Sequence, residues 1–350
     1  MPEVSIAQWH APIKVGRLRI LEAALDAGVP YPHGCGTGEC GGCKSELLSG
    51  HVVHDRHSPD ALSEAERQSG LILACRARPV DDVQVRWLSQ AAPLPMVKLD
   101  TRVASVQRVA HDVVALTLSL PIGAKFEFRP GQFAKLRFGR KLPVRSYSMA
   151  SQPGQSELVF HVRVVPDGLV SPYVAKELAA GEKVELRGPF GDASWQRADD
   201  DVAGGRILLV GGGTGMAPIL SILDAMLREG VVPGRMHVMH GVRAERDLYV
   251  LEQLQQRQRQ HGFRLSTVLS VEPAPGHRFG TPHEVLAQDH PDLRGARVYV
   301  AGPPPMVKAV SELVLSRGVR QRRLFADAFT AAEPEKRSLW ERVTGWGGLD

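Results

Sequence analysis

The chain has 350 residues, of which 43% are hydrophobic and 23% are charged. This length corresponds to about two or three domains of ordinary size, and the composition excludes a disordered, collagen-like or low-complexity chain. The net charge is only +5, from 43 Lys and Arg against 38 Asp and Glu, so it gives little support to nucleic-acid binding and fits an acidic protein partner equally well.

The N-terminus shows no basic segment followed by an apolar core, so we expect no secretory signal. The longest uncharged run, residues 207–223, contains four glycines and a proline, which favours a strand, a loop and a helix over a membrane span. Four cysteines are too few for a disulfide scaffold. We therefore expect a cytoplasmic protein.

The first hundred residues predict a small domain of short strands with one helix. Residues 4–7 indicate a strand, and residues 18–27 an amphipathic helix that Gly28 would end. Further short strands are predicted at 46–48, 51–53 and 83–87. The Ala- and Pro-rich segment 91–95 is typical of a linker.

Three cysteines within this domain have the spacing C-x4-C-x2-C, and a fourth follows at a distance: Cys35, Cys40, Cys43 and Cys75. This spacing is typical of a plant-type [2Fe-2S] site. The glycines between them allow a sharp turn and close approach of N–H groups to the cluster sulfurs. Structural zinc usually requires two C-x2-C or C-x2-H pairs, and reactive thiols are the other alternative. The pattern predicts a β-grasp ferredoxin domain.

The middle of the chain is rich in β-type segments bounded by Pro and Gly. They lie at 101–109, 113–120, 132–138 and 158–165, and they predict a small antiparallel barrel. A helix is predicted at 172–178.

Two motifs in this barrel have the groups that a flavin with a pyrophosphate requires. Arg145, Tyr147 and Ser148 offer a cation, an aromatic ring and a small donor, with Arg145 and Tyr147 on one face of a strand. Gly168-x-x-Ser171 offers N–H groups at a helix start. The alternatives are a solvated β-surface for the first motif and a plain N-cap for the second.

The C-terminal part alternates strands with helices. Residues 206–210 predict a strand, residues 211–215 a Gly-rich turn and residues 216–228 a helix, which is the unit that places a pyrophosphate on a helix N-terminus. The spacing is not G-x-G-x-x-G, and a purely structural turn is the alternative. Further strands at 236–239, 265–269 and 297–300, with helices at 247–260, 281–288 and 304–317, predict a parallel sheet.

In this order, the motifs resemble the ferredoxin–NADP⁺ reductase superfamily, and within it the reductase components of bacterial multicomponent oxygenases. The resemblance covers roughly residues 3–330 and implies a multidomain α+β and α/β chain. It implies a [2Fe-2S] β-grasp domain over 1–92, a six-stranded antiparallel FAD-binding barrel over 97–199 and a parallel-sheet NAD(P)H-binding domain over 200–330.

The resemblance also implies residue roles. Tyr147 would stack on the flavin and Ser148 would bond near its N5, while Arg145 and Ser171 would hold the pyrophosphate. Tyr147, Ser148 and Thr214 are the candidate catalytic residues. The further cofactor-binding candidates are Val162, through its backbone, Gly168, Val170, Gly213, Gly215, Arg243, Glu272, Gly302, Pro303 and Phe329.

One position departs from the family. Ala301 precedes Gly302-Pro303, where the family usually has Cys, so we assign Ala301 no catalytic part. Glu272 would repel a 2′-phosphate and could accept from a ribose hydroxyl, whereas Arg243 favours the opposite. We predict NADH rather than NADPH as the coenzyme.

The predicted function is electron transfer from NADH to FAD, then to the [2Fe-2S] cluster, and finally to a separate Rieske-type aromatic-ring-hydroxylating oxygenase in aromatic hydrocarbon catabolism. The alternatives are a reductase of a diiron monooxygenase or of a deoxysugar dehydrase, and a flavin-based redox sensor. We expect a monomer with no transmembrane segment. In the tail 331–350, an apolar helical face could dock a partner or a membrane surface; a packed helix or a frayed end is the alternative.

Overall fold

The computed structural model describes residues 1–34, 36–38, 41–59, 61–88, 94–197 and 205–329. These residues fall into two compact units. Unit 1 contains Met1–Met96 and Phe190–Asp192, and unit 2 contains Val97–Pro189 and Ala193–Phe329. Most of the expected linker and the whole expected tail helix lie outside the described residues.

Unit 1 is built on a five-stranded sheet of order β2-β1-β7-β3-β5, in which β1 and β7 pair in parallel. The helix α1 buries Ile20 and Leu21 in the core of this unit. The strand β7 alternates, with Val83, Val85 and Trp87 inward, which is the period of two that the sequence predicted. The elements are β1 (Glu3–Ile6), β2 (Ile13–Lys14), α1 (Ile20–Asp26), β3 (Lys44–Ser49), β4 (Val52–His54), α2 (Glu64–Gln68), β5 (Leu71–Leu73), β6 (Ala77–Pro79) and β7 (Val83–Trp87).

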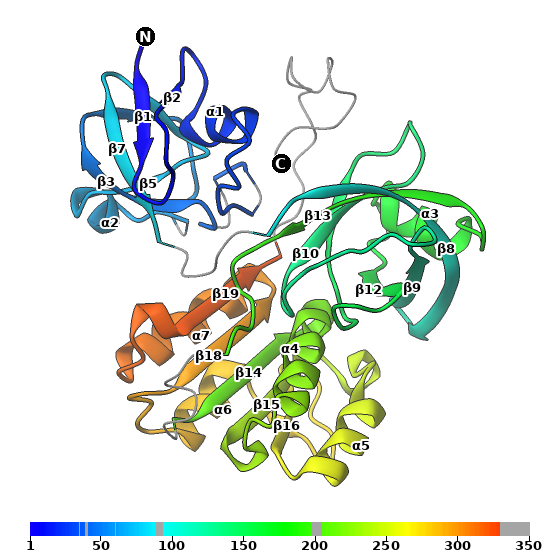
Figure 1. Ribbon diagram of the computed structural model, residues 1–350. Coiled ribbons are helices and arrows are strands. Elements are labelled where there is room, and N and C mark those ends of the chain that lie inside the picture. Colours follow the sequence, from blue (N-terminus) through cyan, green and yellow to red (C-terminus); the bar gives the residue numbers. More distant parts are fainter. Residues whose placement is uncertain (35, 39–40, 60, 89–93, 198–204, 330–350) are drawn as a thin grey trace. The chain divides into compact units, whose positions relative to one another are not determined.

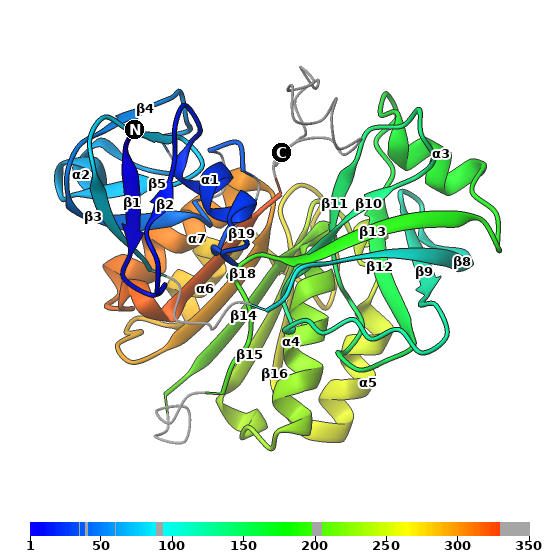
Figure 2. The ribbon, with the colours of Figure 1, turned by 45° about the horizontal axis from the view of Figure 1, so that its top comes forward.

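Unit 2 begins with the six-stranded antiparallel barrel, of order β11-β10-β13-β8-β9-β12 (Figure 2). A bridge between Met149 and Phe160 joins the two end strands and closes the sheet on itself. Inward side chains such as Leu116 and Phe160 fill the barrel core. The elements are β8 (Val97–Ala110), β9 (Val113–Ser119), β10 (Phe133–Arg137), β11 (Arg145–Ser148), β12 (Glu157–Arg163), α3 (Val170–Lys176) and β13 (Lys183–Phe190).

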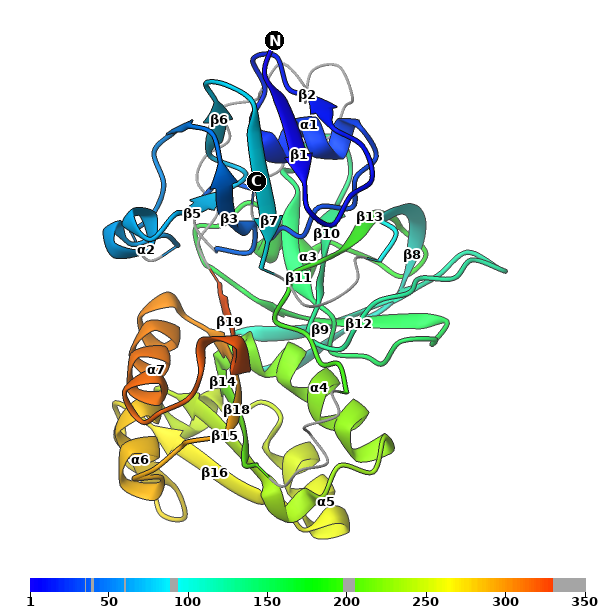
Figure 3. The ribbon, with the colours of Figure 1, turned by 60° about the vertical axis from the view of Figure 1, so that its left-hand side comes forward.

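The rest of unit 2 is a six-stranded parallel sheet of order β17-β16-β15-β14-β18-β19. The helices α4 and α5 cover one face, and α6 and α7 cover the other (Figures 1 and 3). The elements are β14 (Ile207–Gly212), α4 (Met216–Arg228), β15 (Met236–Val242), α5 (Leu251–His261), β16 (Arg264–Leu269), β17 (Arg278–Phe279), α6 (Pro282–Asp289), β18 (Arg297–Gly302), α7 (Pro304–Ser316) and β19 (Leu324–Ala328). Among the residues that the structure describes, single-turn 3₁₀ helices lie at Gly213–Gly215, Pro233–Arg235, Glu245–Asp247 and Gln321–Arg323.

Both halves of unit 2 therefore have the fold that the sequence predicted. The strand β13 was not predicted, although its side chains alternate between solvent and the barrel core, because charged residues and a Gly-Pro pair interrupt its apolar pattern. Within the described part of the chain, no helix combines the length and the apolar character that crossing a membrane requires.

Candidate functional site

The described part of the cysteine loop brings two of the four predicted ligands together. Cys43 and Cys75 are 4% and 2% exposed, and the backbone N–H of Cys75 donates to Cys43 Sγ at 3.4 Å. An N–H group directed at a sulfur is the contact that stabilises a thiolate ligand. Cys35 and Cys40 lie outside the described residues.

The backbone around these cysteines fits a loop that wraps a compact group. Gly36, Gly38 and Gly41 have φ of 81°, 86° and 73°, which L side chains rarely adopt. A Cβ at Gly42 would lie 2.9 Å from the backbone N of Gly34, so the two arms of the loop touch there. This glycine pattern leaves room for a cluster held by several thiolates from one short segment.

The predicted flavin motif lies on β11, and its residues divide between two faces as expected. Arg145 and Tyr147 are half-buried, whereas Ser148 is buried. Arg145 donates to the carbonyl of Val144 at 2.8 Å and has no carboxylate partner among the described residues, so its charge is available to an anion. Burial raises the pKa of Tyr147 well above its ordinary value, and its ring is therefore a neutral stacking surface.

The second flavin motif forms a tight loop at the start of α3. Ser171 Oγ accepts from the N–H of Val165 at 3.0 Å, and a Cβ at Gly168 would lie 3.1 Å from the carbonyl of Val165. Val162 and Val170 both direct their side chains into the barrel core. A ligand at these two positions can therefore meet only the backbone.

In the Gly-rich turn after β14, some glycines are packed against neighbouring backbone and one has space beside its Cα. A Cβ at Gly215 would overlap the carbonyl of Ala301, and a Cβ at Gly302 would lie 2.8 Å from the carbonyl of Gly212. Both glycines are therefore required for the ends of β14 and β18 to approach each other. Gly213 has φ of 52°, and the atom nearest to its Cβ position is Arg163 Nη1, at 4.0 Å.

Other nicotinamide candidates cluster at the same end of the sheet. The N–H of Phe329 donates to the carbonyl of Gly302 at 2.8 Å, so the residue after β19 lies beside the end of β18. Pro303 follows Gly302 and is the N-cap residue of α7, and Thr214 lies half-buried in the turn. The carboxyl ends of parallel strands are where such folds bind ligands.

The two residues expected near the adenosine ribose lie in adjacent loops. The carbonyl of Arg243 accepts from the N–H of Glu272 at 3.2 Å. The carboxylate of Glu272 is bound by both Nη atoms of Arg246, at 3.1 Å each, and both side chains are more than half exposed. Sequence reasoning missed Arg246, because its partner lies 26 residues further along the chain.

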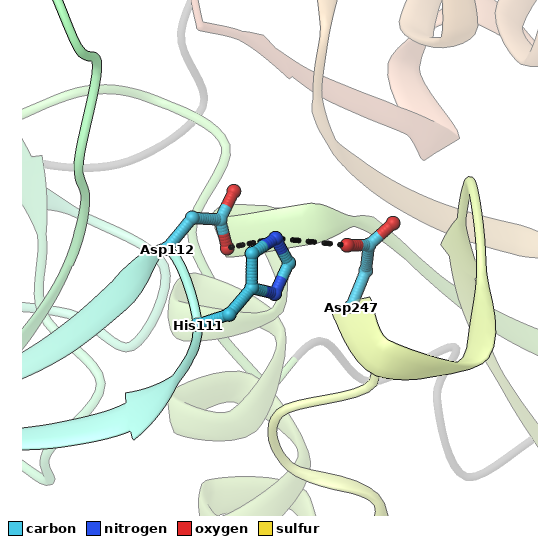
Figure 4. Close-up of side chains that lie close together, drawn as sticks. All are labelled: His111, Asp112 and Asp247. Atoms are coloured by element: carbon cyan, nitrogen blue, oxygen red, sulfur yellow. Dashed lines mark ion pairs between the residues drawn. The ribbon is translucent and has the colours of Figure 1, made fainter.

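A charged cluster joins the barrel to the nucleotide-binding sheet (Figure 4). His111 Nε2 lies 3.9 Å from Asp112 Oδ1 and 3.6 Å from Asp247 Oδ1. Their spacing would suit a metal ion. However, Asp112 also accepts from Arg163 Nε at 2.9 Å and Asp247 from the N–H of Ala244 at 3.0 Å, so we interpret the cluster as an ion-pair contact.

Buried and half-buried polar contacts also join the two halves of unit 2. His161 Nδ1 and the hydroxyl of Tyr249 are 2.9 Å apart, and burial lowers the pKa of His161 to about 4. Ser221 Oγ donates to the carbonyl of Ser151 at 2.7 Å, and Gln152 Nε2 donates to the carbonyl of Ser221 at 2.8 Å. No sequence pattern could have identified these residues, because their partners are 69 to 88 positions apart.

Three features together define an iron–sulfur flavoprotein reductase. They are a cysteine loop suited to a cluster, an antiparallel barrel with a flavin-type motif, and a parallel sheet with a Gly-rich turn. The chain matches the 2Fe-2S iron-sulfur cluster binding domain over residues 8–80, the oxidoreductase FAD-binding domain over 100–195 and the oxidoreductase NAD-binding domain over 209–312.

Named relatives extend this similarity over nearly the whole chain. The chain is 38% identical to the reductase subunit of an aromatic O-demethylase of Amycolatopsis sp., over 89% of this chain and 94% of that protein. It is 33% identical to the reductase component of naphthalene 1,2-dioxygenase/salicylate 5-hydroxylase systems of Ralstonia sp., over 89% of this chain and 93% of that protein.

Solved structures of similar proteins show the same similarity over nearly the whole chain. An Amycolatopsis cytochrome P450 reductase has a TM-score of 0.77 and 36% identity, covering 95% of this chain and all of that one. The ferredoxin reductase in carbazole 1,9a-dioxygenase has a TM-score of 0.69 and 27% identity, covering 94% and 98%. The chain belongs to the ferredoxin reductase family of oxygenase reductase components, and it is an electron-transfer oxidoreductase with 2Fe-2S, FAD-binding and NAD-binding domains.

Proposed function

We propose that the chain is an NADH-dependent reductase that passes electrons through FAD and a [2Fe-2S] cluster to a separate oxygenase acting on an aromatic compound. The observation that carries this proposal is the presence of all three cofactor domains in one chain that matches oxygenase reductases over 89% of its length. A bound FAD would supply hydride acceptance and single-electron transfer. The chain supplies binding, orientation and electrostatics.

We assign the cluster to Cys35, Cys40, Cys43 and Cys75, which is supported by the buried Cys43 and Cys75 and by the glycine backbone around them. The flavin is assigned to Arg145, Tyr147 and Ser148, with the loop from Gly168 to Ser171 and the backbone of Val162. The available guanidinium of Arg145 and the neutral ring of Tyr147 support that assignment. The nicotinamide nucleotide is assigned to Gly213–Gly215, Gly302, Pro303 and Phe329.

The proposed domains are 1–92, 97–199 and 200–330. Each of the three family matches lies inside one of these ranges, which supports the boundaries. We further propose that the protein is a monomer, to be tested by light scattering of the purified chain: a mass near 38.1 kDa is expected, and twice that mass would contradict it.

The preference for NADH rests on Glu272. Its loop lies beside that of Arg243 at the carboxyl ends of β15 and β16, where an adenosine ribose is bound in such folds. A carboxylate there repels a 2′-phosphate and can accept from a 2′-hydroxyl. Arg246 neutralises part of this effect through its ion pair with Glu272.

The first candidate for the partner is a Rieske-type aromatic-ring oxygenase, in keeping with the relatives that serve naphthalene and carbazole dioxygenase systems. A second candidate is a cytochrome P450, since the similar Amycolatopsis structure is named a cytochrome P450 reductase and the similar Amycolatopsis subunit serves an aromatic O-demethylase.

The test is cytochrome c reduction by the purified holoprotein with NADH and, separately, NADPH. We expect a higher kcat/KM with NADH. An equal or higher value with NADPH would contradict the coenzyme preference, and no reduction with either would contradict the electron-transfer role.

The partner is tested separately. The chain is combined with a Rieske dioxygenase or a P450 O-demethylase, and hydroxylated or demethylated product is measured against NADH consumed. Coupled turnover with one and not the other identifies the partner class.

A further inference from the structure

Arg76 connects the two chain segments that carry the cluster ligands. It follows Cys75 directly, and its side chain reaches back to Thr37, which lies between Cys35 and Cys40. Arg76 Nε donates to the carbonyl of Thr37 at 2.6 Å, and Nη2 donates to the same oxygen. One guanidinium therefore links the segment of the fourth cysteine to the middle of the loop of the first three.

The loop is also packed closely against this arginine. Gly38 has φ of 86°, and a Cβ there would lie 2.9 Å from Arg76 Cγ, from Arg76 Nε and from the Cβ of His57. The N–H of Ser58 donates to the carbonyl of Gly38 at 3.0 Å, and the N–H of Asp55 donates to the carbonyl of Arg76 at 2.8 Å. The midpoint of the loop is therefore held between Arg76 and the segment 55–58.

The charge of Arg76 is not balanced by a carboxylate in the part of the chain that the structure describes. The nearby Asp55 pairs instead with Arg19, at 2.6 Å, and with Arg78, at 3.1 Å. A [2Fe-2S] centre with four thiolate ligands is anionic, and reduction adds a further negative charge. A fixed cation beside it favours the reduced form, because the attraction grows with the charge of the cluster.

We propose that Arg76 is a positioning residue for the cluster: it holds the cysteine loop through Thr37, and its charge raises the reduction potential of the cluster. The inference rests on the proposed function, since it requires the [2Fe-2S] cluster at these cysteines. Plant-type clusters have low potentials, so a raised potential makes the transfer of an electron from the flavin more favourable.

The test is the midpoint potential of the cluster in the full-length holoprotein, measured by redox titration with the EPR signal of the reduced cluster. Three variants are compared with wild type. Arg76→Gln keeps a hydrogen-bond donor and loses the charge, and Arg76→Lys keeps the charge and loses the planar guanidinium. Arg78→Gln removes an exposed arginine two residues further along the chain that is paired with Asp55.

We expect a more negative midpoint potential in Arg76→Gln, a value close to wild type in Arg76→Lys, and no change in Arg78→Gln. A wild-type potential in Arg76→Gln, or an equal shift in Arg78→Gln, would overturn the electrostatic role.

The holding of the cysteine loop by Arg76 through Thr37 is tested separately, by the rate at which a chelator removes iron. This rate should rise in Arg76→Lys, and a wild-type rate there would overturn the holding role. If Arg76→Gln fails to assemble a cluster, Arg76→Lys still gives both the midpoint potential and the rate of iron removal. If the wild-type protein itself contains no iron and gives no EPR signal, the proposed function fails. A normal wild-type signal with unshifted variants refutes only the inference about Arg76.

Discussion

The two units hold their ionisable basic side chains in opposite charge states. In unit 1, Arg76 donates to the carbonyl of Thr37 in the cysteine loop and has no carboxylate partner among the described residues. In unit 2, His237 and His240 are buried and His161 is half-buried, and burial lowers their pKa values to about 3, 4 and 4, so all three are neutral at pH 7. An anionic metal cluster benefits from a cation left unneutralised, whereas a titratable side chain packed inside a sheet or barrel is more stable in its uncharged form.

The largest effect should come from removing a cluster ligand. In Cys43→Ser or Cys75→Ser, cytochrome c reduction should fall by more than about tenfold, because even the loss of an outer-shell contact commonly costs that much at a metal site. Flavin reduction by NADH should continue, since its residues lie in unit 2. Stopped-flow absorbance measures both steps. Undiminished cytochrome c reduction in both variants would show that electrons bypass the cluster.

Acid should destabilise unit 2 through its neutral histidines. His237 is buried, with Nδ1 2.8 Å from His290 Nε2 and Nε2 2.8 Å from Ser266 Oγ. Its folded pKa is about 3 against 6.5 for an ordinary histidine, so the unfolded chain takes up the proton first and stability falls as the pH drops below 6.5. Each such histidine contributes at most roughly 1.4 kcal/mol per pH unit.

Urea unfolding at pH 7.5 and 5.5 measures this slope. His237→Gln should reduce the loss of stability between the two pH values, whereas His261→Gln, which replaces an exposed histidine at the end of α5, should not. An identical slope in both variants would mean that His237 is not one of the groups responsible.

A smaller effect is expected at the contact between barrel and sheet. Tyr249→Phe keeps the ring and removes the hydroxyl that bonds His161 Nδ1, which leaves a half-buried nitrogen without that partner. This should cost about 0.5–1.5 kcal/mol in the free energy of unfolding, the usual net contribution of one hydrogen bond. The control is Tyr173→Phe, whose hydroxyl bonds the exposed Glu182. Urea unfolding at pH 7.5 should show a larger loss for Tyr249→Phe, and equal losses would mean that this contact adds no more stability than an exposed hydrogen bond.

The smallest effect concerns coenzyme choice. Glu272→Gln removes the carboxylate that binds Arg246 and frees a guanidinium for a 2′-phosphate. The ratio of kcat/KM for NADPH to that for NADH should rise by about two- to fivefold, since exposed charge pairs are worth up to ~1 kcal/mol. Arg246→Gln should lower the ratio, and Glu252→Gln, at an exposed position of α5, should leave it unchanged. An unchanged ratio in Glu272→Gln would remove Glu272 from the specificity determinants.

Most of the fold and part of the candidate site could be predicted from local sequence patterns. The helix at 216–228 and the strand at 83–87 have the predicted bounds, because their apolar periodicity is strong and their ends are marked. The face shared by Arg145 and Tyr147 followed from the period of a strand. By contrast, β5 and β6 were not predicted, since three residues are too few to show a period.

Contacts between distant segments could not be predicted in the same way. Arg76 and Thr37 are 39 positions apart, and Glu272 and Arg246 are 26 apart. Each pair depends on how loops from different strands meet, which a single sequence does not encode as a spacing. The packing roles of Gly215 and Gly302 were hidden for the same reason, because the atoms that they must clear belong to neighbouring strands.

The most direct test of the electron path is an anaerobic visible spectrum of the purified holoprotein before and after the addition of NADH. The account predicts flavin bands with a broad iron–sulfur shoulder, and both should bleach together within seconds of mixing. Flavin bands without the shoulder, or a shoulder that NADH never bleaches while the flavin is reduced, would contradict the assignment of Cys35, Cys40, Cys43 and Cys75 to a cluster that receives electrons from the flavin.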